Sequence, residues 1–348
     1  MLADSLPGPT TNDVRSSRKG ISDAMASTGQ PPPRAQGQRL AWAQLPAHIR
    51  DAIEDWLGEP VVTAQSMAGG FSPGLASRLT TRPGRRVFAK AVSNTLNPMS
   101  PTLHRREIRV ASRLPSGAPA PRLLWSSQED DGDEWVVLVF EDVQGRPPAQ
   151  PWHPAELDAV VDALNRLTAE LTPSPIATSE IDDILTFGPL VRGNWSYLKF
   201  DNLPRIDPWV SRNLDRLIEA EQRVGEVIAG DTLLHLDLRG ENMLLTDDGV
   251  VIVDWPHARV GAAWIDPIGF APSVAMEGGP EPEDLIARLD ATQSADPEHV
   301  TLGIIEIAGF FTHQGALPPV EGLPGLRAFQ EAQGAVARRW VAQRTGWE

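Results

Sequence analysis

Residues 234–255 contain acidic, basic and amide side chains at spacings that could move a proton and hold a cation. The segment reads Leu-His-Leu-Asp-Leu-Arg-Gly-Glu-Asn-Met-Leu-Leu, then Thr-Asp-Asp-Gly, then Val-Val-Ile-Val-Asp-Trp. Two short apolar runs flank Asp248-Gly249, a pair that favours a hairpin because glycine tolerates positive φ. A hairpin centred near Asp248 would place Asn242 opposite Asp254, with their Cα atoms about 5 Å apart.

An amide oxygen and a carboxylate facing one small space suit Mg²⁺, which keeps several waters and takes further ligands from substrate phosphates. Asp237 lies on the loop that enters the same space, where its carboxylate could accept a proton from a hydroxyl nucleophile. Two other interpretations of this segment stay open. His235, Asp237 and Asp254 could hydrogen-bond a buried turn, or they could ligate a metal such as zinc together with His257.

The spacing His-x-Asp-x-x-x-x-Asn, followed by an apolar strand that ends in Asp, resembles the catalytic loop of protein kinases. Val253-Asp254-Trp255 stands where those enzymes have Asp-Phe-Gly, and it resembles the aminoglycoside phosphotransferase branch, whose members phosphorylate small molecules. The resemblance implies a catalytic base at Asp237, metal ligands at Asn242 and Asp254, and a position near the γ-phosphate for Arg239. It extends over about residues 45–345.

Residues 61–80 read as a strand, a glycine-rich turn and a second strand. The turn contains Gly69, Gly70 and Ser72, and glycines let a backbone approach phosphates and point its N–H groups at them. An ordinary hairpin turn has the same composition. The resemblance implies that this turn covers the nucleotide, although Pro73 departs from the Gly-x-Gly-x-x-Gly form of protein kinases.

Lys90 lies in an apolar strand over residues 85–92 and is one of three lysines in the chain. A lysine in a chain that otherwise uses arginine indicates a site that requires a compact ammonium group. The resemblance implies that Lys90 binds ATP phosphates and that Glu107, on a helix over residues 103–114, is its carboxylate partner. The alternative for Glu107 is a solvated helix face shared with the neighbouring arginines.

The resemblance implies an α+β, bilobal protein-kinase-like fold with a mostly antiparallel sheet in a small lobe and a larger, mainly helical lobe. We expect a nucleotide-binding lobe over residues 40–140, a hinge over 141–151 and a catalytic and substrate lobe over 152–348. The resemblance implies that hinge backbone groups at Glu141 and Val143 bind adenine. It also implies that Asp266 braces the catalytic loop.

Two segments have less regular patterns. Residues 1–39 are rich in Ser, Pro, Gly and Gln, which predicts a disordered tail. Residues 172–209 could form a substrate lid, or their aromatic side chains could belong to the core. Further along, five acidic residues could line a pocket for a polycationic substrate or form a solvated helix face; they are Glu277, Glu281, Glu283, Asp284 and Asp290.

The composition excludes several classes of protein. A net charge of −15 argues against a nucleic-acid binder and favours cationic small molecules. The absence of cysteine excludes disulfides and thiolate chemistry. No apolar run reaches the length of a membrane span and no signal peptide is recognisable, so a cytoplasmic enzyme is expected. No pattern indicates an oligomeric state.

The predicted function is ATP- and Mg²⁺-dependent transfer of a phosphate to a hydroxyl of an aminoglycoside-like or other antibiotic. One alternative is a metabolic kinase of the same family that acts on choline, homoserine or a sugar. Another is a catalytically silent nucleotide-binding regulator, against which the presence of Lys90, Asp237, Asn242 and Asp254 argues. A metal hydrolase that uses His235, Asp237 and His257 is the most distant alternative.

Overall fold

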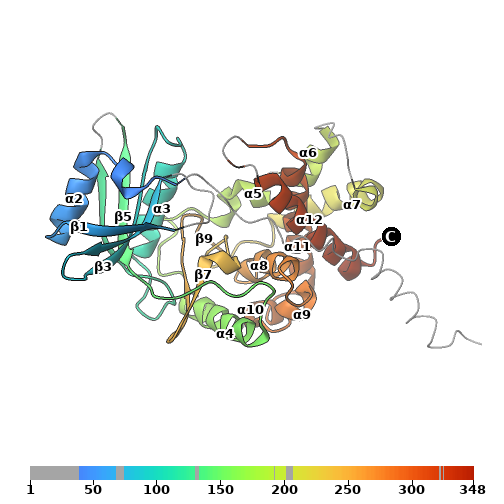
Figure 1. The fold of residues 1–348 in the computed structure, drawn as a ribbon. Helices are drawn as coiled ribbons and strands as arrows, with labels where there is room; N and C mark the ends of the chain where they lie inside the picture. Colours follow the sequence, from blue (N-terminus) through green and yellow to red (C-terminus); the bar gives the residue numbers. More distant parts are fainter. Residues whose placement is uncertain are drawn as a thin grey trace, which may run out of the picture. The chain divides into compact units, whose positions relative to one another are not determined.

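The computed structural model describes residues 39–67, 74–129, 133–191, 193–200, 207–320, 323 and 325–348 (Figure 1). All contacts given below lie within the compact unit formed by residues 33–348. Gly69, Gly70 and Ser72 of the predicted glycine-rich turn lie outside the described residues, as does the predicted tail apart from Arg39.

The N-terminal part of this unit is built on a five-stranded sheet in which every neighbouring pair is antiparallel, as predicted. In spatial order the strands are β1 (Val61–Ser66), β2 (Leu75–Thr81), β3 (Arg86–Ser93), β5 (Trp135–Glu141) and β4 (Leu123–Glu129). Strand β5 is buried along nearly its whole length, because both of its faces are covered.

Two helices cover opposite faces of this sheet. Helix α2 (Ala47–Leu57) packs its buried apolar side on Val137 and Val139 of β5. It ends at Gly58, whose φ of 76° suits a left-handed helix terminus. Helix α3 (Ser100–Ala111) packs on the face that carries Val136 and Leu138, since successive strand residues point to opposite sides.

The C-terminal part of the unit is mainly helical (Figure 1). Its helices are α4 (Pro154–Glu170), α5 (Gly188–Val191), α6 (Asn194–Phe200), α7 (Pro208–Val224), α8 (Ile265–Met276), α9 (Pro282–Ile286), α10 (Asp290–Gln293), α11 (Pro297–Ala316) and α12 (Leu326–Thr345). Single turns of 3-10 helix lie at Trp42–Gln44, Ile184–Thr186 and Gly240–Asn242. Among the described residues, none of the helices combines the length and the apolar character needed to cross a bilayer.

The segment over residues 172–209 is partly helical and partly core. Trp195 of α6 is fully buried, and its indole N–H donates to the Ile305 carbonyl of α11 at 2.9 Å. Tyr197 is 44% exposed. The core interpretation therefore holds for Trp195, which anchors α6 to α11.

The predicted hairpin is present, but its register differs by one residue from our expectation. Strands β7 (Met243–Thr246) and β8 (Gly249–Ile252) pair Met243 with Ile252 and leave a two-residue turn at 247–248. Asn242 consequently lies opposite Val253, whose N–H donates to its carbonyl at 2.9 Å, and the expected pairing of Asn242 with Asp254 is wrong. Gly249, with a φ of 126°, is the first strand residue rather than the second turn residue.

A second small pair of strands lies beside the hairpin. Strands β6 (Thr232–Leu234) and β9 (Arg259–Gly261) are antiparallel and fully buried. The predicted catalytic loop, residues 235–242, runs from the end of β6 to the start of β7, so it leaves a fully buried strand and ends at the buried Met243. This attachment fixes where its polar side chains can reach.

Candidate active site

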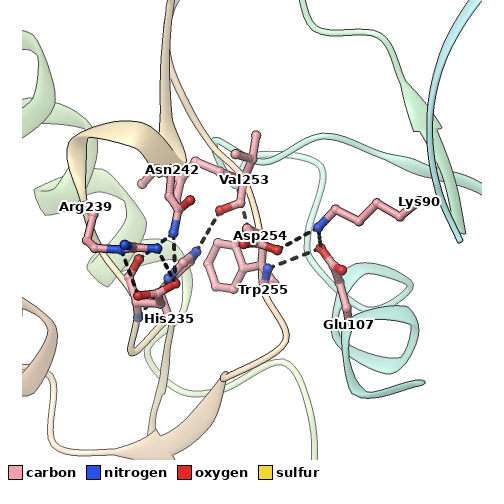
Figure 2. A network of polar contacts seen from close by, with 10 residues as sticks. Lys90, Glu107, His235, Arg239, Asn242, Val253, Asp254 and Trp255 are labelled. Atoms are coloured by element: carbon pink, nitrogen blue, oxygen red, sulfur yellow. Dashed lines mark hydrogen bonds and ion pairs between the residues drawn. The ribbon is translucent and has the colours of Figure 1, made fainter. Parts of the chain in front are cut away.

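Lys90 is the centre of a polar network that joins three separate elements (Figure 2). Its ammonium nitrogen lies 2.6 Å from Glu107 Oε1 on α3 and 2.7 Å from Asp254 Oδ1 just after β8. Strand parity explains the first contact, because Lys90 pairs with Leu138 and shares its sheet face, the one covered by α3. The predicted ion pair between Lys90 and Glu107 is therefore present.

The charged forms of Lys90 and Asp254 stabilise each other. Burial acts to lower the pKa of Lys90, but Asp254 and Glu107 outweigh it and raise that pKa, so the ammonium form persists. Partial burial acts to raise the pKa of Asp254, and the Lys90 ammonium outweighs it and holds that pKa well below its usual range. The Asp254 carboxylate is thus ionised at any physiological pH.

The catalytic loop is braced by Asp266 at the start of α8. One Asp266 oxygen accepts from the His235 N–H at 2.7 Å and the other from the Leu236 N–H at 2.8 Å. Leu236 has a φ of 62°, a conformation that is unfavourable for this residue type and needs such support. The predicted bracing contact of Asp266 is confirmed by these two hydrogen bonds.

His235 is a buried structural residue rather than an open ligand. It is fully buried, its Nε2 lies 3.0 Å from the Val253 carbonyl, and its Nδ1 accepts from the Asp237 N–H. The ring therefore carries its proton on Nε2 and links the loop to the end of β8. Its edge packs on Trp255 at a centroid distance of 4.6 Å (Figure 2).

Asp237 projects from this braced loop with its side chain 27% exposed. The Arg239 Nε lies 3.1 Å from Oδ1, and the Asn242 amide nitrogen donates to the Asp237 carbonyl at 2.8 Å and to Oδ2 at 3.1 Å. These contacts hold the carboxylate in one orientation while part of it stays accessible. That is the arrangement a proton acceptor requires.

Asn242 and Asp254 offer oxygen atoms suited to Mg²⁺. Because the side-chain nitrogen of Asn242 donates to Asp237, the side-chain oxygen Oδ1 is the atom available as a metal ligand. Asp254, with a φ of 73°, adds an ionised carboxylate that is 40% exposed. Among the described residues no group of three or more His, Asp or Glu side chains could hold a metal, so the zinc interpretation gains no support.

Arg239 is committed to neighbouring side chains in this structure. Besides Asp237 it contacts Glu241 at 2.5 Å, and its guanidinium lies 5.6 Å from the centre of the Phe329 ring on α12. Burial acts to lower its pKa, but Asp237 and Glu241 raise it. These contacts fix the positions of Asp237 and Glu241 relative to Arg239 within the loop.

One cavity of about 770 Å³ receives these side chains, and Lys90, Asp237, Asn242 and Asp254 all line it. Hinge residues Glu141 and Val143 line the same cavity. The Glu141 N–H already donates to the Arg122 carbonyl at 3.1 Å, and the Val143 carbonyl accepts from Arg78 at 2.8 Å. A contact with a base there would use the remaining backbone group of each residue.

Sequence reasoning missed two residues that line this cavity. Arg39, which we had assigned to the tail, lies beside Gly74 in a short parallel bridge, and its charge interacts with Asp254. His104 lies one turn before Glu107 on α3, and burial followed by the Lys90 charge lowers its pKa to about 3. The helical spacing of three residues could have indicated His104; no motif indicates Arg39.

Comparisons with known proteins agree on a family and a fold. The model of a family described as the phosphotransferase enzyme family matches residues 68–300. A search of curated proteins finds no match.

Solved structures share the fold. The aminoglycoside phosphotransferase of Alicyclobacillus acidocaldarius is 18% identical, with a TM-score of 0.53 over 82% of this chain and 92% of that one. A mutant of aminoglycoside 2′-phosphotransferase IIIa in its GDP complex is 14% identical, with a TM-score of 0.58 over 86% and 97%. Amicoumacin kinase hAmiN with AMP-PNP, Ca²⁺ and Ami is 13% identical, with a TM-score of 0.53 over 97% of each chain. The predicted kinase-like α+β fold is confirmed.

Proposed function

Because the chain belongs to the phosphotransferase enzyme family, we propose that it transfers the γ-phosphate of ATP to a hydroxyl group of a small molecule, with Mg²⁺ as the metal. The observation that carries this proposal is the convergence of Lys90, Asp254 and Asp237 on one cavity. A lysine held by two carboxylates, a metal-binding carboxylate and a separate proton acceptor are the parts that phosphoryl transfer requires.

Each residue has a role that its contacts support. Lys90 binds nucleotide phosphates as an ammonium group, and Glu107 holds it in place. Asn242 and Asp254 hold the metal through oxygen atoms. When bound, Mg²⁺ supplies positive charge that offsets the negative charge of the phosphates. Arg239 supports the orientation of Asp237.

The chemical step needs a proton acceptor on the alcohol side. The acceptor oxygen forms a bond to the γ-phosphorus as the bond from that phosphorus to ADP breaks, and Asp237 takes the hydroxyl proton. The products are a phosphate ester and ADP. Asp266, which holds the two residues before Asp237, acts as a positioning residue.

The acceptor we propose is a hydroxylated antibiotic. Similarly folded proteins include an aminoglycoside phosphotransferase and an amicoumacin kinase, and the complexes of these folds hold GDP or AMP-PNP with Ca²⁺. These neighbours support a nucleotide, a divalent metal and a small organic acceptor as the three ligands of this chain.

The test is acceptor-dependent release of ADP from ATP and Mg²⁺, measured over a panel of antibiotics, choline, homoserine and simple sugars. Transfer to an antibiotic, with a phosphate ester detected by mass spectrometry, supports the proposal. Transfer only to a metabolite would contradict the antibiotic acceptor and favour a metabolic kinase. Failure to bind ATP with Mg²⁺ would overturn the proposed reaction itself.

A further inference from the structure

The cavity extends from the catalytic loop to a surface formed mainly by α11 and α12, which we call the acceptor surface. Its large side chains are apolar and come from three elements; they are Leu190, Phe310, Phe311, Leu326 and Phe329. Phe310 and Phe311 pack edge to face at a centroid distance of 5.1 Å. Phe329 lies next to Arg239, so this surface begins beside the proposed catalytic base.

Carboxylates of the described residues are absent from the acceptor surface. The carboxylates that line the rest of the cavity already have partners in the chain: Asp254 is bonded to Lys90, Glu241 to Arg239, Asp142 of the hinge to Arg78 and Arg86, and Asp266 of α8 to the backbone of the loop. A compound with several ammonium groups loses hydration on entering a cavity and needs carboxylates in return. The acceptor surface as described offers none.

The acidic cluster that we had considered for a polycation lies elsewhere. Glu277 accepts from the Trp152 indole at 3.0 Å, and Glu283 accepts from the Trp340 indole at 2.7 Å and contacts Arg344 at 2.5 Å. None of the five acidic residues from 277 to 290 lines the cavity. Their charges therefore serve helix packing and the outer surface.

Gln333 supplies the polar feature of the acceptor surface. It lines the cavity and is 2% exposed, and its Oε1 is buried with no hydrogen-bond donor among the described residues. Gln330, one turn earlier, differs because its Oε1 already accepts from Arg327 at 2.8 Å. Gln333 follows Phe329 by four positions and Leu326 by seven, so all three share one face of α12.

A buried carbonyl oxygen without a donor is unfavourable and is normally bonded to a protein group, a water or a ligand. An apolar surface with one such oxygen is complementary to an apolar molecule that carries one well-placed donor. A mostly apolar pocket with a few precisely placed polar groups is typical of sites for small molecules.

We propose that the acceptor is an alcohol with a large apolar body and few positive charges, whose hydroxyl or N–H group donates to Gln333 Oε1. This inference rests on the proposed phosphotransferase function and narrows its acceptor class. Polycationic aminoglycosides are thereby poor acceptors for this chain, although related folds act on them.

Calorimetric titration of the full chain tests the assignment in the presence of AMP-PNP and Mg²⁺. Erythromycin and chloramphenicol serve as apolar alcohols, and kanamycin and hygromycin B as polycationic ones. We expect at least one apolar probe to bind about tenfold or more tightly than either polycation, a difference that one uncompensated buried charge is enough to produce. The inference would be overturned if either polycation bound more tightly than both apolar probes, or if neither apolar probe bound.

The variant Gln333→Leu tests the hydrogen bond separately. Losing one neutral hydrogen bond should weaken binding of the preferred apolar probe by about 2- to 10-fold, while AMP-PNP affinity stays the same. The matched control is Gln343→Leu, an exposed glutamine on the same helix, which should change neither affinity. Equal affinities for the probe in both variants would contradict the role of Gln333.

The two proposals fail in distinguishable ways. AMP-PNP binding is measured first in the same titration, and its absence would contradict the phosphotransferase proposal. Normal AMP-PNP binding with the reverse order of acceptor affinities would contradict only the proposed acceptor class. The comparison of probes uses the unaltered chain, so it stands even if Gln333→Leu does not fold.

Discussion

The ammonium nitrogen of Lys90 lies 2.7 Å from Asp254 Oδ1, although the two residues are 164 positions apart in the chain. The contact joins β3, the central strand of the antiparallel sheet, to the second residue after the β7–β8 hairpin (Figure 2). Both charges are maintained by their proximity, because each shifts the pKa of the other toward the ionised form. The proposed nucleotide site is therefore formed where these two elements approach each other, and variants of either element can test it.

Lys90→Ala should lower kcat by about 100-fold or more, because it removes a positive charge aimed at the phosphates and leaves Glu107 buried without its partner. ADP release would measure the loss of activity, and AMP-PNP titration would measure nucleotide affinity. Lys199→Ala is the matched control, since that lysine is exposed and its ammonium group pairs with the exposed Asp215. Unchanged activity and nucleotide affinity in Lys90→Ala would contradict the assignment.

Asp237→Asn should lower kcat by about 100- to 10,000-fold, because the amide keeps the shape but cannot take the hydroxyl proton. AMP-PNP affinity should stay close to that of the unaltered chain, since Asn242 and Asp254 are untouched. Single-turnover measurement of phosphate transfer, compared with Asp248→Asn in the exposed hairpin turn, would show the difference. Full activity in Asp237→Asn would require another base.

Arg39→Gln should raise the KM for ATP by about tenfold, because the guanidinium lies in the cavity beside Asp254 and can contact the nucleotide phosphates. The loss should be smaller at high salt, where charge interactions are screened. The exposed Arg339→Gln on α12 serves as control. An unchanged KM for ATP would indicate that Arg39 interacts with other residues of the chain and does not contact the nucleotide.

Glu306 should make stability depend on pH. It is fully buried on α11, and burial together with the Glu221 charge raises its pKa to about 8. The folded chain therefore binds a proton that the unfolded chain releases at lower pH, so stability should fall as pH rises from about 4.5 to about 8. Thermal melts at several pH values would follow this decrease.

The variant Glu306→Gln isolates that effect. Its amide oxygen can still accept from Asn194, which donates to Glu306 at 2.7 Å, but it carries no titrating proton. At pH 8 we expect it to be more stable than the unaltered chain by on the order of 3 kcal/mol, and at pH 5 nearly equal. The exposed Glu298→Gln is the control on the same helix. Parallel pH profiles for Glu306→Gln and the unaltered chain would refute this explanation.

Local patterns in the sequence were enough for several elements. Helix α2 follows from its apolar spacing and from Gly58, whose missing Cβ allows the left-handed end. The ion pair of Lys90 with Glu107 was implied by the family resemblance together with the order of strand and helix along the chain, and the structure contains it. Regular elements and their termini depend on nearby residues, which is why sequence reasoning reaches them.

The hairpin shows where local reasoning fails. Asp248-Gly249 favours a turn, but the pairing of Met243 with Ile252 moved the turn by one residue and placed Asn242 opposite Val253. In a strand pair a shift of one residue changes which side chains face each other. The register was decided by burial of Met243 and Ile252, which the turn residues alone do not reveal.

The sequence by itself determined the candidate chemistry: a carboxylate base, two oxygen ligands and one strand lysine, in the order of a kinase. Only the tertiary structure decided that Arg39 enters the cavity and that the acceptor surface is apolar. Composition pointed the other way, since a net charge of −15 favoured cationic partners. Net charge counts every carboxylate equally, whereas a binding surface presents only the side chains that folding turns toward it; at the acceptor surface these include Phe310, Phe311, Phe329 and Gln333.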